Sequence, residues 1–387
     1  MSRRWRARDR RGRVHLGGLW AGDRRRLRGG RPLTDDRPVL FVTNHAPAFR
    51  VGAFGQLHAR ERVVFALIGG DVRHGGGDGR ETALPFDVLR PAQHEVYGLA
   101  ASGRYRAVIA GLSGRLAPAA AWAGARRARV PFVLWATMWA HPRTAAHALT
   151  FLPVRALYRD ADAIVTYGPH VSAYVRRAGA RGPVVEAPQS VDDAFWAGAA
   201  PAPVRRAPFQ ALFVGRMEAE KGVDVLLHAW RASGLQASPG AALVLVGDGP
   251  LRDRAEGPRG PAEVRNFYAG SDVVVLPSVF TRAFREPWGL VVNEAFDQGV
   301  PVIATDAVGA AAGGLVAHER TGLVVPAGAP GPLAAALRRV HDDPGLRRRL
   351  GAAAREAVRA YSYDAWADGM SRGLAAVGAS RTRNPGC

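Results

Sequence analysis

Lysine and cysteine are almost absent from this chain of 387 residues. Of its 53 basic side chains only Lys221 is a lysine, and Cys387 is the only cysteine. A single cysteine excludes a disulfide within the chain and favours a reducing compartment, so the sequence predicts a cytoplasmic protein. Isoleucine and asparagine are also scarce, whereas alanine, glycine, proline and arginine are abundant. This bias indicates a GC-rich gene. In such a gene Lys221 either remained by chance or was retained because its position requires a compact ammonium group.

Long hydrophobic runs are missing as well. No uncharged apolar run reaches the roughly 18 residues that a membrane-spanning helix needs. The first arginines are not followed by the apolar core of a signal peptide. The hydrophobic content of 48% is nevertheless that of a folded protein, and 387 residues fit two domains better than one.

Acidic residues are few relative to basic ones, which gives a formal net charge of +20. Residues 1–37 alone hold thirteen arginines and four aspartates. We expect residues 1–36 to be a disordered Arg-rich tail or the product of a translation start placed too early. An arm that touches anionic lipids at the inner membrane face, or nucleic acid, is the alternative. No reading motif or aromatic platform accompanies the charge, so we expect no specific nucleic-acid partner.

Short apolar runs alternate with amphipathic stretches, first in one series and then in a second. Continuous apolar strands between helices predict parallel sheets covered on both faces. The expected strands are 39–44, 62–70, 106–111, 130–136 and 162–168 in the first series, and 210–215, 242–249, 272–277, 300–306 and 322–326 in the second. A helix is expected at about 50–60.

The predicted fold class is therefore α/β, with two Rossmann-like domains. They would span residues 37–190 and 209–358, joined by a linker rich in Pro and Ala at 191–208, and residues 359–387 would form a C-terminal helix and tail. Ligands of open parallel sheets bind beyond the carboxyl ends of the strands. The loops that follow the strands are the expected site.

The loop GRMEAEKG places Gly215, Arg216 and Lys221 directly after a predicted strand. A guanidinium fork and a compact point charge at one loop can together neutralise a diphosphate. The loop is not a P-loop, because GxxxxGK[ST] is absent. Charges that simply face solvent on an ordinary turn are the alternative.

The segment EPWGLVVNEAF holds two carboxylates, Glu286 and Glu294. The proline after Glu286 keeps this residue out of a helix, whereas a helix that begins at about Gly289 would contain Glu294. The amides of Gly289 and Leu290 would then form an anion site. Carboxylates beside an anion site indicate a ligand with hydroxyl groups, such as a sugar. Two glutamates on a solvated face are the alternative.

Other motifs are weak or missing. Asp248 in VGDGPLRDR belongs either to a loop that approaches a ligand closely or to a helix N-cap. No Cys/His cluster has metal-ligand spacing, and GxSxG is absent.

Together the segments GRMEAEKG, VGDGP, EPWGLVVNE and GVPVIATDAVGAAAGGLVAHERTGLVVPAG resemble the retaining glycosyltransferases of family 4, which have the GT-B fold. The resemblance covers about residues 184–370. It implies two domains that face each other across a cleft, and a C-terminal helix, at YSYDAWADGM, that crosses back to the first domain. It also implies a nucleoside-diphosphate sugar, such as a UDP- or GDP-sugar, as the donor, and neither a metal nor another cofactor.

The resemblance also implies roles for the residues of these motifs. Arg216 and Lys221 would bind the diphosphate and stabilise its charge as it leaves. Glu294 would bind ribose hydroxyls. Glu286, with the amides of Trp288, Gly289 and Leu290, would meet the sugar and the distal phosphate.

The first domain resembles the family less closely. His141, after VLWATMWA, resembles a histidine that touches the donor sugar, and an ordinary loop histidine is the alternative. The loop NHAPAFRVGAF resembles a Pro-x-Arg-Val variant, which leaves His45 and Arg50 without an assigned role. The segment around Gly309 would lie near the sugar. Residues 255–271 are shorter than the helix and strand that read the base in relatives.

The implied function is transfer of a sugar with retention of anomeric configuration, in polysaccharide, cell-wall, glycolipid or natural-product synthesis. The acceptor could be a glycan, a lipid-linked molecule or a small molecule. Two rivals stay open from the sequence. One is a degenerate member that binds a nucleotide sugar without turnover, because the base region is short, and the other is a basic nucleic-acid-binding protein.

Overall fold

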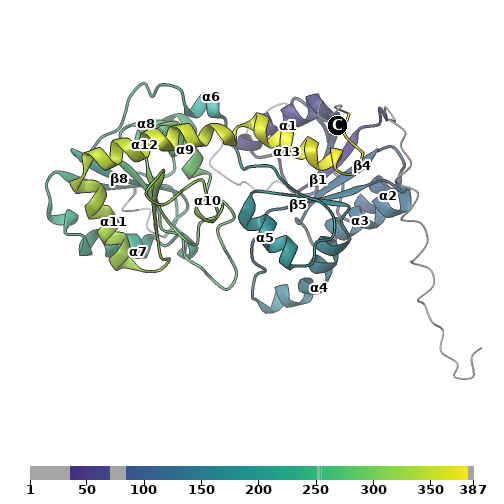
Figure 1. Ribbon diagram of the computed structural model, residues 1–387, viewed down its shortest axis with the longest axis horizontal. Coiled ribbons are helices and arrows are strands. Elements are labelled where there is room, and N and C mark those ends of the chain that lie inside the picture. The colour runs from purple at the N-terminus through teal and green to yellow at the C-terminus, as the bar shows by residue number, and fades with distance from the viewer. Residues whose placement is uncertain (1–34, 70–83, 251–252, 254, 382–387) are drawn as a thin grey trace, which may run out of the picture. The chain divides into compact units, whose positions relative to one another are not determined.

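The computed structural model describes residues 35–69, 84–250, 253 and 255–381. The tail expected over residues 1–36, apart from its last two residues, lies outside this range. From Asp36 onward the chain forms one compact unit, which contains two parallel β-sheets (Figure 1).

The first sheet has seven parallel strands in the order β3-β2-β1-β4-β5-β6-β7. They are β1 (Val39–Thr43), β2 (Val63–Leu67), β3 (Asp87–Leu89), β4 (Ala107–Gly111), β5 (Phe132–Ala136), β6 (Ala163–Thr166) and β7 (Val184–Glu186). Its helices are α1 (Ala48–Glu61), α2 (Val96–Ala101), α3 (Ala117–Ala128), α4 (Ala145–Asp160) and α5 (Pro169–Arg177). Strands β1, β4 and β5 are buried at every position, which explains their continuous apolar sequences.

The second sheet has five parallel strands in the order β12-β11-β10-β8-β9. They are β8 (Phe209–Val214), β9 (Ala241–Val246), β10 (Val273–Leu276), β11 (Val302–Thr305) and β12 (Gly322–Val325). Its helices are α6 (Asp193–Trp196), α7 (Val223–Ala232), α8 (Pro261–Ala269), α9 (Val291–Asp297), α10 (Gly309–Ala312), α11 (Pro330–Asp342) and α12 (Pro344–Val358), with the short 3₁₀ turns η3 (Ala219–Lys221), η4 (Leu235–Ala237) and η6 (Arg359–Tyr361).

Alternate residues of the central strand β8 enter two different cores. Phe213 packs in a cluster with residues of α7 and α11, whereas its neighbour Leu212 belongs to the cluster that includes α8 and α9. Because side chains alternate across a strand, the two helix pairs must cover opposite faces of the sheet. Figure 1 shows α7 and α11 on one side of the second sheet and α8 and α9 on the other.

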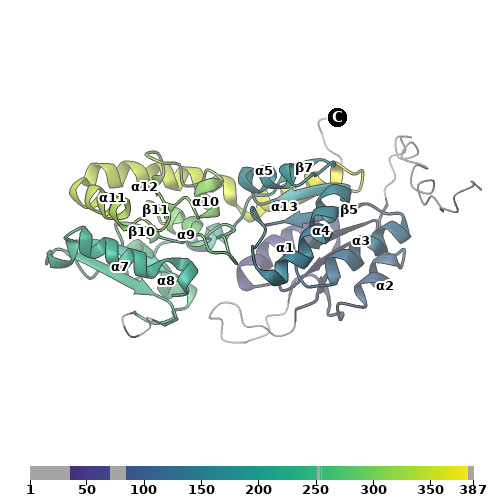
Figure 2. The same cartoon turned by 90° about the horizontal axis from the view of Figure 1, so that it is seen from below.

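The last helix, α13 (Tyr363–Ala375), packs against α1, β6 and β7 of the first sheet, although α12 just before it packs against α9 and β12 of the second (Figures 1 and 2). Trp366 on α13 is fully buried, with its ring 5.6 Å from that of Phe54 and 5.9 Å from that of Trp135. The predicted helix that crosses back to the first domain is confirmed.

Some elements differ from expectation. Strands β3 and β7 were not predicted, because each has only three residues and neither is fully buried. Helix α9 begins at Val291 and not at Gly289, because Gly289 has a φ of 96°, outside helical geometry. Between β9 and β10 the described residues contain α8 and no strand.

Candidate functional site

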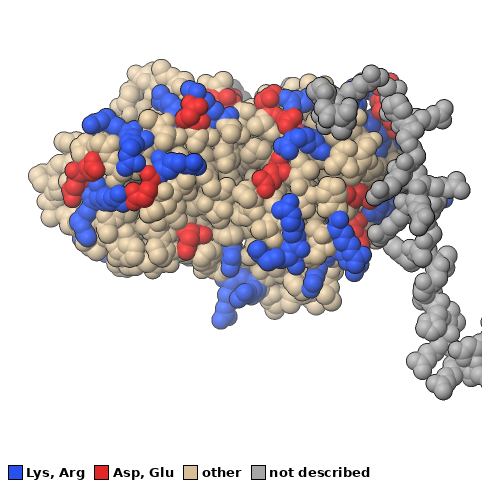
Figure 3. Space-filling view, in the orientation of Figure 1, with Lys and Arg blue, Asp and Glu red and all other residues tan. Residues whose placement is uncertain are grey.

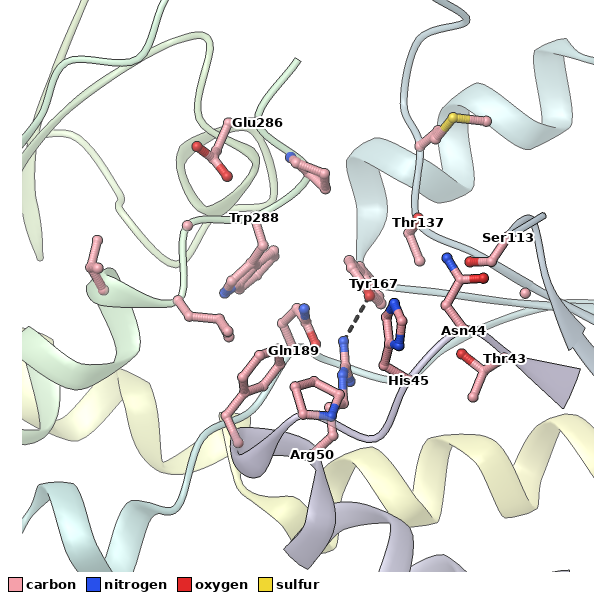
Figure 4. Close-up of a pocket in the computed structure, with 18 of the residues that line it drawn as sticks. Thr43, Asn44, His45, Arg50, Ser113, Thr137, Tyr167, Gln189, Glu286 and Trp288 are labelled. Atoms are coloured by element: carbon pink, nitrogen blue, oxygen red, sulfur yellow. Dashed lines mark hydrogen bonds between the residues drawn. The ribbon is translucent and has the colours of Figure 1, made fainter. Parts of the chain in front are cut away.

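A cavity of about 570 Å³ lies where the loops after the strands of both sheets meet. Loops after β1, β4, β5, β6 and β7 contribute to it from the first sheet, and loops after β8 and β10 from the second. Figure 4 shows Glu286 and Trp288 on one side of the cavity, and Asn44, Ser113 and Thr137 on the other. The volume is that of a pocket for a ligand of drug or cofactor size.

The structure brings seven of the ten predicted site residues to this cavity. They are Gly215, Arg216, Lys221, Glu286, Trp288, Gly289 and Leu290. Asp248, Glu294 and His141 are not among the residues that line it. Their roles, like those of the seven, stay predictions.

Lys221 and Glu286 form an ion pair in the wall of the cavity. The Lys221 ammonium contacts Glu286 Oε2, and their side chains are only 15% and 9% exposed. Ser278 Oγ also donates to Glu286 Oε2, at 3.4 Å. Arg216 is different: it is 65% exposed, and its Nη2 lies 3.4 Å from Glu220 Oε1. A pair this exposed contributes little stability, so Arg216 is free to turn toward a ligand.

The backbone of the segment 286–290 has its oxygens engaged, whereas amides of this segment, including those of Gly289 and Leu290, are available. The Glu286 carbonyl accepts from Gly309 N at 3.1 Å. A Cβ atom at Gly309 would lie 2.0 Å from the Pro287 carbonyl oxygen, so this close approach requires glycine. The amides of Gly289 and Leu290 donate to no group in the described part of the chain. They are available to an anionic ligand in the cavity.

Two first-sheet side chains hold the same segment from the other side. Trp139 Nε1 donates to the Glu286 carbonyl at 3.0 Å, and His170 Nε2 donates to the Pro287 carbonyl at 3.2 Å. Burial lowers the pKa of His170, although the bond to the Pro287 carbonyl acts in the opposite direction. The sequence did not single out Trp139 or His170. Both follow first-sheet strands, but no motif distinguishes them from other aromatic loop residues.

The loops after β8 and β9 are joined backbone to backbone. Gly215 N donates to Val246 O at 3.0 Å, and Met217 N donates to Asp248 O at 2.8 Å. The Asp248 carboxylate accepts from the adjacent Gly249 amide at 2.9 Å. Asp248 thus shapes the loop beside the cavity.

The shortened segment after β9 returns to the end of that strand. Glu256 N donates to Leu245 O at 2.8 Å, and Gly247 N donates to Gly257 O at 3.0 Å. Its backbone therefore runs beside the loop that contains Gly247 and Asp248.

Glu294 lies within α9, where Tyr268 Oη donates to its Oε2 at 2.7 Å. Burial raises the pKa of Glu294 to about 7, although the bond from Tyr268 acts in the opposite direction. Burial, with the nearby carboxylates of Asp193 and Glu294, also raises the pKa of Asp297 to about 7.

His141 lies at two other cavities. Its Nε2 donates to the His147 carbonyl at 2.8 Å, and its ring centroid is 5.2 Å from that of Phe151. These cavities measure about 220 Å³ and about 580 Å³.

The first-sheet side of the central cavity carries polar residues that the sequence left without a role. They include Asn44, His45, Arg50, Ser113, Thr137, Tyr167 and Gln189. Apart from Arg50, which lies in the first turn of α1, they follow the carboxyl ends of strands directly. The rule for parallel sheets therefore predicted their loops, although not the individual side chains.

No three His, Cys, Asp or Glu side chains lie together as metal ligands in residues 35–69, 84–250, 253 and 255–381. In the same ranges no helix is long and apolar enough to cross a membrane. The absence of a metal from the reaction stays a prediction.

A family model described as "Glycosyl transferases group 1" matches residues 208–343, which contain the second sheet. The D-inositol 3-phosphate glycosyltransferase of Kineococcus radiotolerans is 34% identical over 229 residues, 48% of this chain and 50% of that protein. The lipopolysaccharide core biosynthesis glycosyltransferase LpsD of Rhizobium meliloti is 31% identical over 243 residues, 56% of this chain and 66% of that protein. The chain thus spans about half to two thirds of the length of these relatives. It is related in sequence to glycosyltransferases.

Solved structures show the fold. The Anabaena protein HepE, in complex with UDP and glucose, matches with a TM-score of 0.66 and 17% identity over 88% of this chain and 99% of that one. Sucrose-phosphate synthase from Thermosynechococcus elongatus matches with a TM-score of 0.64 and 20% identity over 87% and 98%. The predicted GT-B fold is confirmed.

Proposed function

We propose that this chain is a family 4 glycosyltransferase that moves a sugar from a nucleoside-diphosphate sugar to an acceptor with retention of anomeric configuration. One observation carries the proposal. A single cavity joins Arg216, Lys221, Glu286 and the free amides of Gly289 and Leu290, in the region that is related to glycosyltransferases. HepE, which has the same fold, has been solved with UDP and with UDP-glucose.

The donor binds by exchanging partners at the Lys221–Glu286 pair. A diphosphate attracts the ammonium more strongly than one carboxylate does, because it carries more charge and more acceptor oxygens. Arg216 turns in from solvent to the same group. Glu286 is then released to accept hydrogen bonds from sugar hydroxyls, and the amides of Gly289 and Leu290 bind the distal phosphate.

Transfer replaces one bond to the anomeric carbon with another. The bond to the diphosphate oxygen breaks as the bond from the acceptor hydroxyl oxygen forms, and the acceptor proton passes to the departing diphosphate on the same face. Arg216 and Lys221 stabilise the negative charge that develops on the leaving group. Water must be kept out during this step, because it would compete with the acceptor.

Glu294 would hold the ribose only after its carboxylate leaves Tyr268, because it is bonded to Tyr268 Oη and does not line the cavity. The base would lie beside residues 256–257, whose backbone follows the end of β9. The acceptor class is a glycan, a lipid-linked molecule or a small molecule, in polysaccharide, glycolipid or natural-product synthesis.

A donor screen tests the proposal. UDP, GDP and their sugar conjugates are titrated into the full chain while its melting temperature is measured, and any donor that stabilises it is incubated with an acceptor panel and analysed by mass. We expect stabilisation by one nucleotide class and a product heavier by one sugar. No stabilisation by any of them would overturn the proposal, and stabilisation without product across the panel would favour a degenerate, binding-only protein.

A further inference from the structure

Arg50, in the first turn of α1, is a buried cation in the wall of the central cavity. It is only 4% exposed, and it is among the residues that line the cavity. Its Nη2 donates to Tyr167 Oη at 2.7 Å, whereas its Nη1 is buried and has no hydrogen-bond partner. Figure 4 shows the side chain extending toward Tyr167 with Gln189 and His45 on either side.

Another buried arginine of the same sheet, Arg106, shows how this protein normally satisfies such a group. Arg106 is also 4% exposed, but its Nη2 contacts Glu61 Oε2 at 2.7 Å. Its Nε and Nη1 donate to backbone carbonyls, those of Ala379 at 2.8 Å and Arg37 at 2.6 Å. Arg50, in contrast, donates a hydrogen bond to neither a carboxylate nor a backbone carbonyl among the described residues.

Among residues 35–69, 84–250, 253 and 255–381, the interactions of Arg50 are with aromatic side chains and with no carboxylate. The guanidinium carbon lies 4.8 Å from the centroid of the Trp135 ring and 5.4 Å from that of Tyr167. The titratable groups that act on it are Tyr167 and Tyr363, and burial lowers its pKa. Ring faces attract a cation, but they do not supply hydrogen-bond acceptors for its N–H groups. A buried charge without a counter-charge is costly, so its partner is expected to come with a ligand.

The position of Arg50 indicates which ligand this is. Its neighbours Trp135 and Tyr167 belong to the first sheet, as do the polar residues Ser113 and Thr137 of the same cavity. The cations that we assign to the donor diphosphate, Arg216 and Lys221, come from the second sheet. We infer that Arg50 binds an oxyanion, a phosphate or a carboxylate, carried by the acceptor. This inference rests on the proposed function only in calling the ligand an acceptor.

Anion binding to the full chain tests the inference directly. Inorganic phosphate and, separately, acetate are titrated calorimetrically at constant ionic strength, with and without a saturating nucleoside diphosphate that occupies the second-sheet cations. The wild type is compared with Arg50→Gln and with Arg231→Gln, which removes the same charge from an exposed position on α7. We expect Arg50→Gln to bind the preferred anion roughly tenfold or more weakly, because a hydrogen-bonded charge is lost, and to bind the nucleotide as the wild type does.

Comparing anion binding with nucleotide binding in the wild type and the variants distinguishes the possible outcomes. Equal anion binding by the wild type and Arg50→Gln would overturn the inference, and so would a parallel loss of nucleotide binding, which would place Arg50 in the donor site. If no nucleotide binds the wild type, the proposed function fails, while the anion titration without nucleotide still tests Arg50. If Arg50→Gln does not fold, Arg50→Lys takes its place. A purely structural role predicts a lower melting temperature with unchanged anion affinity, and that result would also overturn the inference.

Discussion

The surroundings of Lys221 in the structure suggest why the only lysine of the chain stands at this position. In composition it is one lysine among arginines, but in the structure it is a mostly buried ammonium that contacts Glu286 in the wall of a cavity. Arginine offers a planar fork on a longer side chain, which could not occupy the same point between Glu286 and the diphosphate that we propose as the ligand. The proposed role therefore gives a geometric reason for lysine at this position, which composition alone could not give.

The first prediction concerns this residue. Lys221→Arg keeps the charge, so we expect the protein to fold with an unchanged melting temperature but to lose roughly tenfold or more in kcat/KM, because a charged hydrogen bond is misplaced. A transferase assay with the donor found by screening measures the effect. Arg231→Lys, an equally conservative change at an exposed position, is the control. Full activity in Lys221→Arg would refute the role assigned to the lysine.

Glu294 gives a prediction about pH. Its pKa is raised from 4.5 to about 7 in the folded protein, so between these values the folded chain keeps a proton that the unfolded chain has released. The free energy of unfolding must therefore fall as the pH rises through this interval, and it levels off above it. Glu294→Gln keeps an oxygen that can accept from Tyr268 but cannot titrate.

As the pH rises from 4.5 to about 7, we expect the free energy of unfolding of the wild type to fall by about 1–3 kcal/mol relative to that of Glu294→Gln. Urea denaturation at a series of pH values measures the difference. Asp297, whose pKa is also raised to about 7, is present in both proteins, so its own titration largely cancels. Parallel stability curves for the two proteins would show that Glu294 is already ionised in the fold.

At the scale of elements, the loops after β8 and β9 form one structural unit because their backbones approach each other closely. A Cβ atom at Gly247 would lie 1.9 Å from Gly215 O, a separation that no side chain can tolerate. This contact fixes the loop that presents Arg216 to the cavity. Gly247, in the loop after β9, therefore helps to position the loop that contains Arg216.

Gly247→Ala tests that coupling. We expect a loss of about 3 kcal/mol or more in the free energy of unfolding, together with weaker nucleotide binding. Gly234→Ala is the control, because Gly234 also has a positive φ, of 77°, but no heavy atom lies within 4 Å of an added Cβ. Gly234→Ala should lower the free energy of unfolding by only about 1 kcal/mol, because alanine is strained at this positive φ. Similar losses in the two variants would mean that φ, and not the contact, requires glycine at position 247.

The strands were predictable from sequence to the extent that they are buried. All ten predicted strands are present, because each is an apolar run that lies between helices in a parallel sheet. The three-residue strands β3 and β7 carry partly exposed residues, so they gave no apolar run to detect. The start of α9 was predicted two residues early because apolar spacing does not reveal the positive φ of Gly289.

The site was predictable only where sequence neighbours are also neighbours in space. Arg216 and Lys221 share one loop, and Glu286 and Leu290 share another, so short motifs pointed to them. Arg50 could not be found in this way, because its isolation is visible only when strands β5 and β6 bring Trp135 and Tyr167 around it.

The molecule as a whole is basic, and contact with anionic lipid was the alternative interpretation of its Arg-rich tail. Helix α4 offers another place for such a contact. Figure 3 shows basic side chains in several groups over the visible face, with fewer acidic ones among them. On α4, Leu149 and Leu152 are 83% and 70% exposed, close in sequence to the exposed arginines Arg155 and Arg159. Exposed leucines beside arginines on one helix are typical of a helix that rests on a bilayer surface.

We expect co-sedimentation with vesicles that contain anionic phospholipid, and much less with neutral vesicles. Changing Leu149 and Leu152 to Gln should weaken the anionic binding roughly tenfold, because two apolar side chains no longer enter the bilayer. Leu116→Gln, at another exposed leucine, is the control. If the double variant binds anionic vesicles as the wild type does, the arginines alone cause the association. If the wild type does not bind them, the protein does not associate with anionic membranes.

The return of α13 to the first sheet has a consequence for biosynthesis. The aromatic cluster around Phe54 and Trp135 stays incomplete until Trp366 joins it, and Trp366 is translated only after the whole second sheet. At the usual speed of ribosomes, the nascent first sheet waits roughly ten to forty seconds with this apolar surface uncovered. During that interval we expect the exposed apolar surface to attract chaperones, because folding of the first sheet is complete only when the last helix has been made.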